Sequence, residues 1–186
     1  MSVKLIALAA SYRAESYNEQ LLRIAVREAE ASGAHVTTLE YASLEAPIFR
    51  DTDEDASELP AGVAALASAL LTHDGILLAS PEYNWSMPAS LKNLIDWLSV
   101  DARAPLAGKT ALLMTATPST RGGITGLTQL RTPLMNLHVW VYPQLIGIGQ
   151  CISGLSPEGL VHAKERDYMR QHVADFVATT RKLTSH

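Results

Sequence analysis

Four polar side chains stand close together near the N-terminus, directly after the apolar run of residues 3–10. They are two hydroxyls, a guanidinium and a carboxamide: Ser11, Ser16, Arg13 and Asn18. All four can donate hydrogen bonds to phosphate oxygens, and an arginine can donate two parallel bonds to one phosphate. The types and spacing of these residues therefore favour the binding of a phosphate group.

The element that would position them is a helix, whose apolar pattern begins at Leu21 and runs to about Ser32. Where a strand leads through a turn into a helix, the first helical amides are unpaired and carry partial positive charge. The turn contains no glycine, so it is neither a dinucleotide fingerprint nor a Walker loop. A plain turn in which Ser16 caps the helix is the alternative interpretation.

Two further polar turns follow apolar runs. After residues 75–80 the chain reads Pro81-Glu82-Tyr83-Asn84-Trp85-Ser86-Met87-Pro88. Pro88 fits the first turn of a helix over residues 91–98, and Ser86 could cap that helix. The third turn follows the run at residues 110–114 and extends from Thr115 through Thr117 to Gly123.

Apolar runs of strand type alternate with amphipathic helical patterns along the chain. The predicted strands are residues 3–10, 35–41, 75–80, 110–114 and 139–146, and the helices are residues 21–32, 63–71, 91–98, 127–137 and 169–177. Such alternation predicts an α/β fold with a parallel sheet covered by helices on both faces. Five strands suit a flavodoxin-like doubly wound sheet of order 2-1-3-4-5. The turns after strands one, three and four should then meet at one crevice.

Length and composition are those of one globular domain spanning residues 1–186. Hydrophobic residues make up 47% and charged residues 18% of the chain. A net charge of −4 argues against nucleic-acid binding, which depends on an excess of Lys and Arg. No apolar run reaches the roughly 18 residues that span a membrane. A single cysteine, Cys151, is typical of a reducing compartment, so we expect a cytoplasmic protein.

A long polar connection at residues 42–58 contains a group of carboxylates that includes Asp51, Asp53, Glu54, Asp55 and Glu58. Grouped carboxylates can bind calcium, but the glycine and spacing of an EF-hand loop are missing here. A solvated loop is therefore the preferred interpretation, and we predict no metal site.

The three turns carry sequence motifs in a fixed order. The first motif is Ser11-x-Arg13-x-x-Ser16-x-Asn18, and the second is Pro81-Glu82-Tyr83-Asn84 followed by Ser86-x-Pro88 and Leu91-Lys92-Asn93-x-x-Asp96-Trp97. The third ends at Gly122-Gly123. Together they resemble the NAD(P)H-dependent FMN reductases, flavodoxin-like enzymes that include quinone, azo-dye and chromate reductases.

This resemblance implies an FMN cofactor, with NADPH or NADH as the electron donor. The residues at matching positions, which we expect to contact the cofactor, are Ser11, Arg13, Ser16, Tyr17, Asn18, Pro81, Glu82, Tyr83, Asn84, Trp85, Thr115 and Thr117. The first turn would hold the phosphate, and the second would offer backbone groups to the polar edge of the flavin. No side chain is expected to act as a catalytic acid or base, because the hydride chemistry belongs to the cofactor.

Two positions depart from the usual motif. Ala10 stands in place of a glycine before the phosphate turn, and Trp85 stands where glycine is common. The Trp85 ring could restrict access to the flavin, stack on a substrate or fill a subunit interface. Glu82 could be a general acid or a surface carboxylate, and Lys92 with Asp96 could contact a partner or form a helical ion pair.

Two functions of different classes remain open at this stage. The first is an FMN-dependent oxidoreductase that takes hydride from NAD(P)H and passes electrons to a quinone, a free flavin or a similar small acceptor. The second is a non-enzymatic module of the flavodoxin fold, either an electron carrier or an interaction protein. The mild net charge and the Pro-Glu-Tyr-Asn segment favour the enzyme, because electron carriers of this fold are strongly acidic.

The resemblance also implies a homodimer or a dimer of dimers, paired near the long loop and the helix at residues 91–97. Trp85, Met87 and Trp97 are large apolar groups around one turn, of the kind enriched in interface cores. A single crevice and the absence of a second glycine-rich nucleotide turn predict a ping-pong reaction, in which donor and acceptor occupy the same place in turn.

Overall fold

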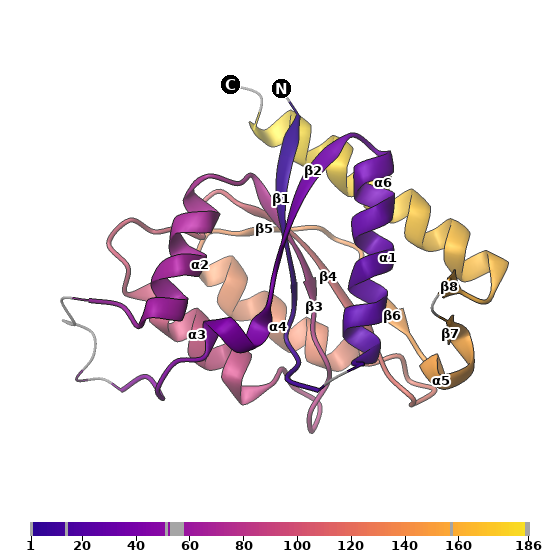
Figure 1. The fold of residues 1–186 in the computed structure, drawn as a ribbon, viewed down its shortest axis with the longest axis horizontal. Helices are drawn as coiled ribbons and strands as arrows, with labels where there is room; N and C mark the ends of the chain where they lie inside the picture. Colours follow the sequence, from indigo (N-terminus) through magenta and orange to yellow (C-terminus); the bar gives the residue numbers. More distant parts are fainter. Residues whose placement is uncertain (1, 14, 51, 53–57, 157, 185–186) are drawn as a thin grey trace.

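A six-stranded parallel sheet forms the centre of the computed structural model, which describes residues 2–13, 15–50, 52, 58–156 and 158–184 (Figure 1). Its strands are β1 (Val3–Ala9), β2 (Ala34–Leu39), β3 (Gly75–Ala79), β4 (Thr110–Ala116), β5 (Trp140–Val141) and β6 (Ile146–Ile148). The order is β2-β1-β3-β4-β5, with β6 also paired to β4. The predicted parallel sheet of order 2-1-3-4-5 is confirmed.

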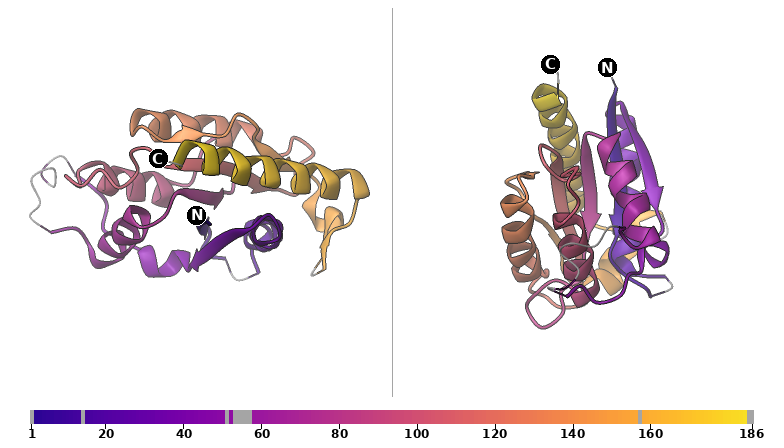
Figure 2. Two further views of the ribbon diagram at one scale, coloured as in Figure 1. Left: turned by 90° about the horizontal axis from the view of Figure 1, so that it is seen from above. Right: turned by 90° about the vertical axis from the view of Figure 1, so that its left-hand side faces the viewer.

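Helices cover both faces of the sheet, and Figure 2 shows the resulting layers. One face packs against α1 (Tyr17–Ala31) and α6 (Ala163–Thr184), and the other packs against α2 (Ala61–Leu71), α3 (Ala89–Ser99) and α4 (Ile124–Asn136). Every residue of β3 and β4 is buried, because both faces of these central strands are covered. Strand β2 lies at one edge of the sheet, as its alternating sequence predicts.

The sequence predicted one continuous last strand over residues 139–146, and this prediction is wrong. The structure divides it into β5 and β6, which both pair with β4. Between these two pairings β4 advances from Ala111 to Met114, whereas its partner advances from Val141 to Ile146. The partner therefore carries extra residues in an unpaired segment, and that segment includes Pro143, which has no amide hydrogen to donate.

Other boundaries also differ from the sequence prediction. Helix α1 begins at Tyr17, four residues before the first apolar position of its pattern, because Ser16 caps it. Ser86 does not cap α3, whose N-cap residue is Pro88. Three short elements were not predicted: the 3₁₀ helix η1 (Tyr41–Leu44), helix α5 (Cys151–Gly154) and the hairpin of β7 (Leu155–Ser156) with β8 (Gly159–Leu160). Among the described helices, none is long and apolar enough to cross a membrane.

Gly75 allows β3 to lie close to β4. A Cβ atom at this position would lie 2.2 Å from Thr110 Oγ1, a hydroxyl that is itself 2.7 Å from Thr180 Oγ1 of α6. Gly75→Ala should therefore lower the free energy of unfolding by about 1–3 kcal/mol through overpacking. Urea denaturation measures this loss.

Gly154→Ala is the matched control, because the nearest atom to its added Cβ would be Glu165 Oε2 at 3.7 Å. We expect this control to change stability by less than about 0.5 kcal/mol. Equal stability of the two variants would contradict the close packing of β3 on β4.

Candidate functional site

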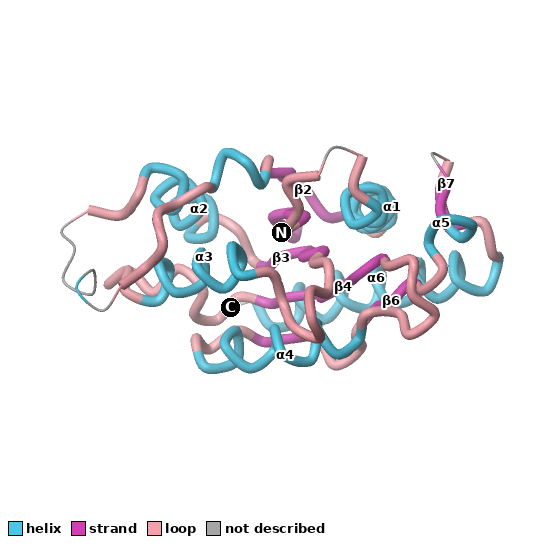
Figure 3. Tube along the Cα trace, turned by 90° about the horizontal axis from the view of Figure 1, so that it is seen from below, coloured by secondary structure: helices cyan, strands magenta, loops and turns pink. Residues whose placement is uncertain are grey.

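Three turns meet at the edge of the sheet where β1, β3 and β4 end. Figure 3 shows this edge from below. Each turn is tied to the neighbouring strand by its first amide: Ala10 donates to Ala79 O at 2.8 Å, Ser80 to Met114 O at 2.9 Å and Thr117 to Ile148 O at 2.9 Å. The predicted gathering of the three turns is confirmed.

The first turn joins β1 to α1. The Ser16 hydroxyl accepts a hydrogen bond from Asn18 N at 3.2 Å, so Ser16 is the N-cap of α1. The Ser11 hydroxyl accepts one from Arg13 N at 3.3 Å. The exposed Arg13 side chain forms no ion pair with any residue that the structure describes. Its guanidinium is therefore free to bind an anion.

Asn18 has a structural role that the sequence did not indicate. Its buried side chain donates from Nδ2 to Ala116 O at 3.2 Å and accepts at Oδ1 from Ala116 N at 3.0 Å. The carboxamide thus ties the start of α1 to the end of β4. Tyr17, the first residue of α1, is half-buried against the core between α1 and the sheet. The predicted contacts of both residues with a cofactor remain predictions.

Tyr12 holds the first turn against η1. Its ring lies 4.9 Å from the ring of Tyr41, centre to centre, and the Tyr41 hydroxyl is 2.9 Å from Ser90 Oγ of α3. Burial raises the pKa of Tyr41 to about 12, so this phenol stays neutral at physiological pH. The first turn is thereby anchored by an uncharged aromatic pair.

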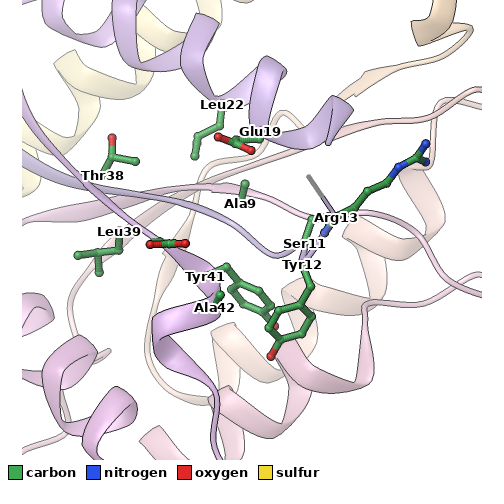
Figure 4. A pocket seen from close by; sticks show the side chains of 11 residues that line it. Ala9, Ser11, Tyr12, Arg13, Glu19, Leu22, Thr38, Leu39, Tyr41 and Ala42 are labelled. Atoms are coloured by element: carbon green, nitrogen blue, oxygen red, sulfur yellow. Dashed lines mark hydrogen bonds between the residues drawn. The ribbon is translucent and has the colours of Figure 1, made fainter. Parts of the chain in front are cut away.

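A hollow of about 490 Å³ lies on the β2 side of the first turn, shown in Figure 4. Ser11, Tyr12 and Arg13 contribute to its wall, together with residues from the end of β2 and the start of η1. The Arg13 guanidinium extends away from the other side chains drawn there. No residue of the second or third turn lines this hollow, so it is separate from the meeting point of the three turns.

The second turn is a tight hairpin. Tyr83 N donates to Ser86 O at 2.9 Å and Ser86 N donates to Tyr83 O at 3.0 Å, and Asn84 and Trp85 between them both have positive φ, at 50° and 67°. Such a turn favours Asn followed by Gly. A tryptophan in this left-handed conformation costs roughly 1–2 kcal/mol. Both aromatic side chains of the turn, Tyr83 and Trp85, are more than half exposed.

Glu82 caps a helix from another part of the chain. Its Oε2 accepts a hydrogen bond of 2.6 Å from Gly126 N, in the first turn of α4. A Cβ on Gly126 would lie 3.1 Å from Glu82 Cβ and from Ser86 O, so the glycine leaves room for this contact. Both sequence interpretations of Glu82, a general acid and a surface carboxylate, missed this role because the two residues are 44 positions apart.

The third turn is braced by its own hydroxyls. Thr117 Oγ1 accepts from Ser119 N at 3.2 Å, and Ser119 Oγ accepts from Arg121 N at 3.2 Å. Thr115 lies fully buried beneath the turn, with its Oγ1 3.1 Å from the place where a Cβ of Gly123 would stand. This hydroxyl has no hydrogen-bond partner among the described residues. Thr115 is therefore not exposed at the three turns, whereas Thr117 is half-buried, and the predicted contacts of both with a cofactor remain predictions.

Two further interactions join side chains of these segments. Lys92 pairs with Asp96 on α3 at 2.6 Å, which confirms the helical ion pair. The Arg121 guanidinium lies over the Trp85 ring, a contact that no sequence motif indicated.

Within the described residues no cluster of three metal-ligating side chains occurs; Asp51 and the carboxylates at positions 53–55 lie outside them.

The sequence and the fold both match known redox proteins. A family model described as NADPH-dependent FMN reductase matches residues 3–151. A quinone reductase of Escherichia coli K12 is 36% identical over 151 residues, which cover 79% of each chain. An NAD(P)H-dependent FMN reductase of Pseudomonas aeruginosa is 27% identical over 184 residues, 97% of each chain. The fold is similar to that of FerB, a flavoenzyme NAD(P)H:(acceptor) oxidoreductase from Paracoccus denitrificans, with a TM-score of 0.83 at 21% identity over 97% of this chain and 98% of FerB.

Proposed function

Because the chain belongs to the family of NADPH-dependent FMN reductases, we propose that its three turns hold FMN and admit NAD(P)H and a small acceptor to it. The chain is an FMN-dependent NAD(P)H oxidoreductase of the quinone reductase type. Bound FMN supplies the two-electron exchange between donor and acceptor. Quinones and free flavins are the acceptor classes that we propose.

The observation that carries the placement of the phosphate is a difference between two helix N-termini. The N-terminus of α4 already receives the Glu82 carboxylate. No described carboxylate is bound in this way at the N-terminus of α1, where the acidic residue of the first turn, Glu19, pairs instead with Arg23 one turn further along. A doubly charged phosphate therefore fits at α1, between Ser11, Ser16 and Arg13.

The second turn supports a role at the flat ring of FMN. Two contacts hold this turn in place: the backbone hydrogen bonds between Tyr83 and Ser86, and the bond of the Glu82 carboxylate to α4. They fix the positions of Pro81, Tyr83, Asn84 and Trp85. A rigid backbone can present its amides and carbonyls to the ring edge at little cost in entropy. The Thr115 hydroxyl beneath Gly123, which has no hydrogen-bond partner in the described part of the chain, is a further polar group close to the third turn.

The absorbance spectrum of the purified protein tests this function. We expect bound or added FMN to give a flavin spectrum that bleaches when NADPH is added without oxygen and returns when a benzoquinone is added. A colourless protein that takes up no FMN would instead favour the second candidate, an interaction module of the same fold. A protein that binds FMN without reacting with NADH or NADPH would favour an electron carrier.

We predict a ping-pong reaction, because the three turns form one meeting point and the sequence offers no separate glycine-rich turn that would hold the nicotinamide donor. Donor and acceptor must then occupy the same place in turn. Steady-state rates with NADPH and a benzoquinone, both varied, should give parallel double-reciprocal lines. Intersecting lines would mean that a ternary complex forms and that a separate donor pocket exists.

We also propose a homodimer, formed at the face made by the long loop and α3. Trp97 Nε1 and Asn93 Nδ2 donate to Pro47 O at 2.8 and 2.9 Å and so hold the loop on the helix. Ile48, the next residue, is 79% exposed. The sequence prediction based this interface on the apolar side chains of Trp85, Met87 and Trp97. That basis is wrong for two of them, because Trp97 is buried and Met87 is half-buried in the core. A hollow of about 360 Å³ beside Ile48 could receive the partner's side chains.

Light scattering at micromolar concentration tests the dimer. Wild type should have at least twice the mass of one chain, and Ile48→Glu should shift it toward one chain because it buries a charge in the interface. Ile152→Glu is the matched control, since Ile152 is 68% exposed on α5, which lies away from α3. A wild-type monomer, or equal effects of the two variants, would contradict this interface.

The cytoplasm is the proposed location, because the chain contains one cysteine, and that cysteine is buried.

A further inference from the structure

The second and third turns are joined by an exposed pair of side chains. The guanidinium carbon of Arg121 lies 4.7 Å from the centre of the Trp85 ring, a cation–π contact. Trp85 is 54% exposed and Arg121 is also exposed, so neither side chain is buried by the contact. The pair is therefore accessible at the place where the two turns meet.

Both partners stand on backbone that is fixed before any ligand arrives. Trp85 occupies the left-handed position of the hairpin closed by Tyr83 and Ser86. The amide of Arg121 donates to Ser119 Oγ, and a Cβ on Gly147 of β6 would stand 2.4 Å from Gly122 O, so the third turn lies directly on that strand. The orientation of the pair costs little further ordering when something binds.

No carboxylate of the described residues neutralises the charge of Arg121. Arg121 forms no ion pair with any carboxylate in the described part of the structure. Glu82, the carboxylate of the neighbouring turn, is bound to Gly126 N. A guanidinium stacked on an aromatic ring keeps its in-plane N–H groups available, and these match the geometry of phosphate, sulfonate and carboxylate oxygens.

We propose that Trp85 and Arg121 together bind the acidic group of an aromatic substrate, and so select anionic ligands over neutral ones at this site. The proposal rests on the proposed function, because it concerns ligands that approach the same three turns. Two substrates could carry the acidic group: the nicotinamide donor, through its additional phosphate in NADPH, or an acceptor with an acidic substituent on its ring. The shared chemistry is an anionic group on a ligand that also carries a flat aromatic ring.

The test measures the binding of unreactive ligand pairs to the oxidised, FMN-loaded enzyme by tryptophan fluorescence and calorimetry. The first pair is NADP⁺ and NAD⁺, which differ by one phosphate. The second pair is anthraquinone-2-sulfonate and 2-(hydroxymethyl)anthraquinone, which differ in charge. In at least one pair the more anionic ligand should bind about tenfold or more tightly than its partner, as one charge-assisted contact predicts.

Substitutions then assign that preference to the pair. Arg121→Gln should remove the preference, and Arg121→Lys should retain part of it. Arg131→Gln, the same change of charge on α4, should leave it intact. Loss of the preference in the NADP⁺ pair alone would identify the donor as the anionic substrate, and loss in the anthraquinone pair alone would identify the acceptor. Trp85→Leu should weaken all ligands of the responding pair, whatever their charge.

Two results would overturn the proposal: no preference for the anionic member in either wild-type pair, or a preference that Arg121→Gln leaves unchanged. Neither result bears on FMN binding, which is measured separately by flavin absorbance. A chain that fails to take up FMN would contradict the proposed function instead, so the two failures are distinguishable.

Discussion

Arg13→Ala should weaken FMN binding by roughly ten- to hundredfold, because it removes a charge-assisted contact to the phosphate worth about 1.5–3 kcal/mol. The Arg13 side chain is exposed, and it is the backbone amide of Arg13, not the guanidinium, that donates to Ser11 Oγ. The substitution should therefore affect the ligand and leave the fold intact. Titration of the FMN-free protein with FMN, followed by flavin fluorescence, measures the change.

Riboflavin provides the sharpest control for this effect, because it has the same ring system and no phosphate. Wild type should bind riboflavin more weakly than FMN, and Arg13→Ala should leave the affinity for riboflavin unchanged. Arg27→Ala removes an arginine of α1 that donates to Glu158 O, away from the first turn, and should not alter FMN binding. An equal FMN affinity in wild type and Arg13→Ala would mean that the phosphate is held by another part of the chain.

Glu82→Ala should destabilise the protein by about 0.5–2 kcal/mol, the usual cost of losing a helix cap. The Glu82 carboxylate is the acceptor for Gly126 N at 2.6 Å, and without it the N-terminus of α4 loses a compensating charge. FMN affinity should fall as well, because the second turn loses its attachment to α4. Thermal unfolding and FMN titration measure the two effects. Glu30→Ala, an exposed carboxylate on α1, should change stability by less than about 0.5 kcal/mol.

Glu82→Gln separates this positioning role from an acid role. A glutamine keeps an oxygen that can accept from Gly126 N, so stability and FMN affinity should remain closer to wild type than in Glu82→Ala. Turnover should follow FMN affinity, because no proton from Glu82 is needed. If Glu82→Gln bound FMN normally but lost its reaction with NADPH or the quinone, Glu82 would be a proton donor and the positioning role would be insufficient.

The sheet could be predicted from sequence because its signals are local and strong. Strands β1, β3 and β4 are short apolar runs between polar turns, and burial on both faces accounts for their continuous hydrophobicity. The split of the last strand was missed, although Pro143 and Gln144 interrupt residues 139–146 and a proline argues against one continuous strand. The pairing with β4 shows that the chain between β5 and β6 carries unpaired residues.

The site was predictable to the level of the three turns and no further. Motif positions located the first and second turns, and the parallel topology explains why they meet. The direction of each side chain depends on contacts between turns far apart in the chain. Glu82 with Gly126 and Trp85 with Arg121 are such contacts, and Asn18 bonds to Ala116 across 98 positions. The left-handed hairpin was also hidden, because a tryptophan occupies the position where glycine would have indicated it.

The backbone conformation of Trp85 has a consequence for engineering this protein. A search for stabilising substitutions would select this position early, since a glycine there would relieve a conformation that costs a tryptophan roughly 1–2 kcal/mol. The same exchange would remove the aromatic surface beside Arg121. Proteins commonly lose activity when strained residues of a binding site are replaced by stabilising ones. Thermostability should therefore be sought in the helices remote from the three turns, with residue 85 left as tryptophan.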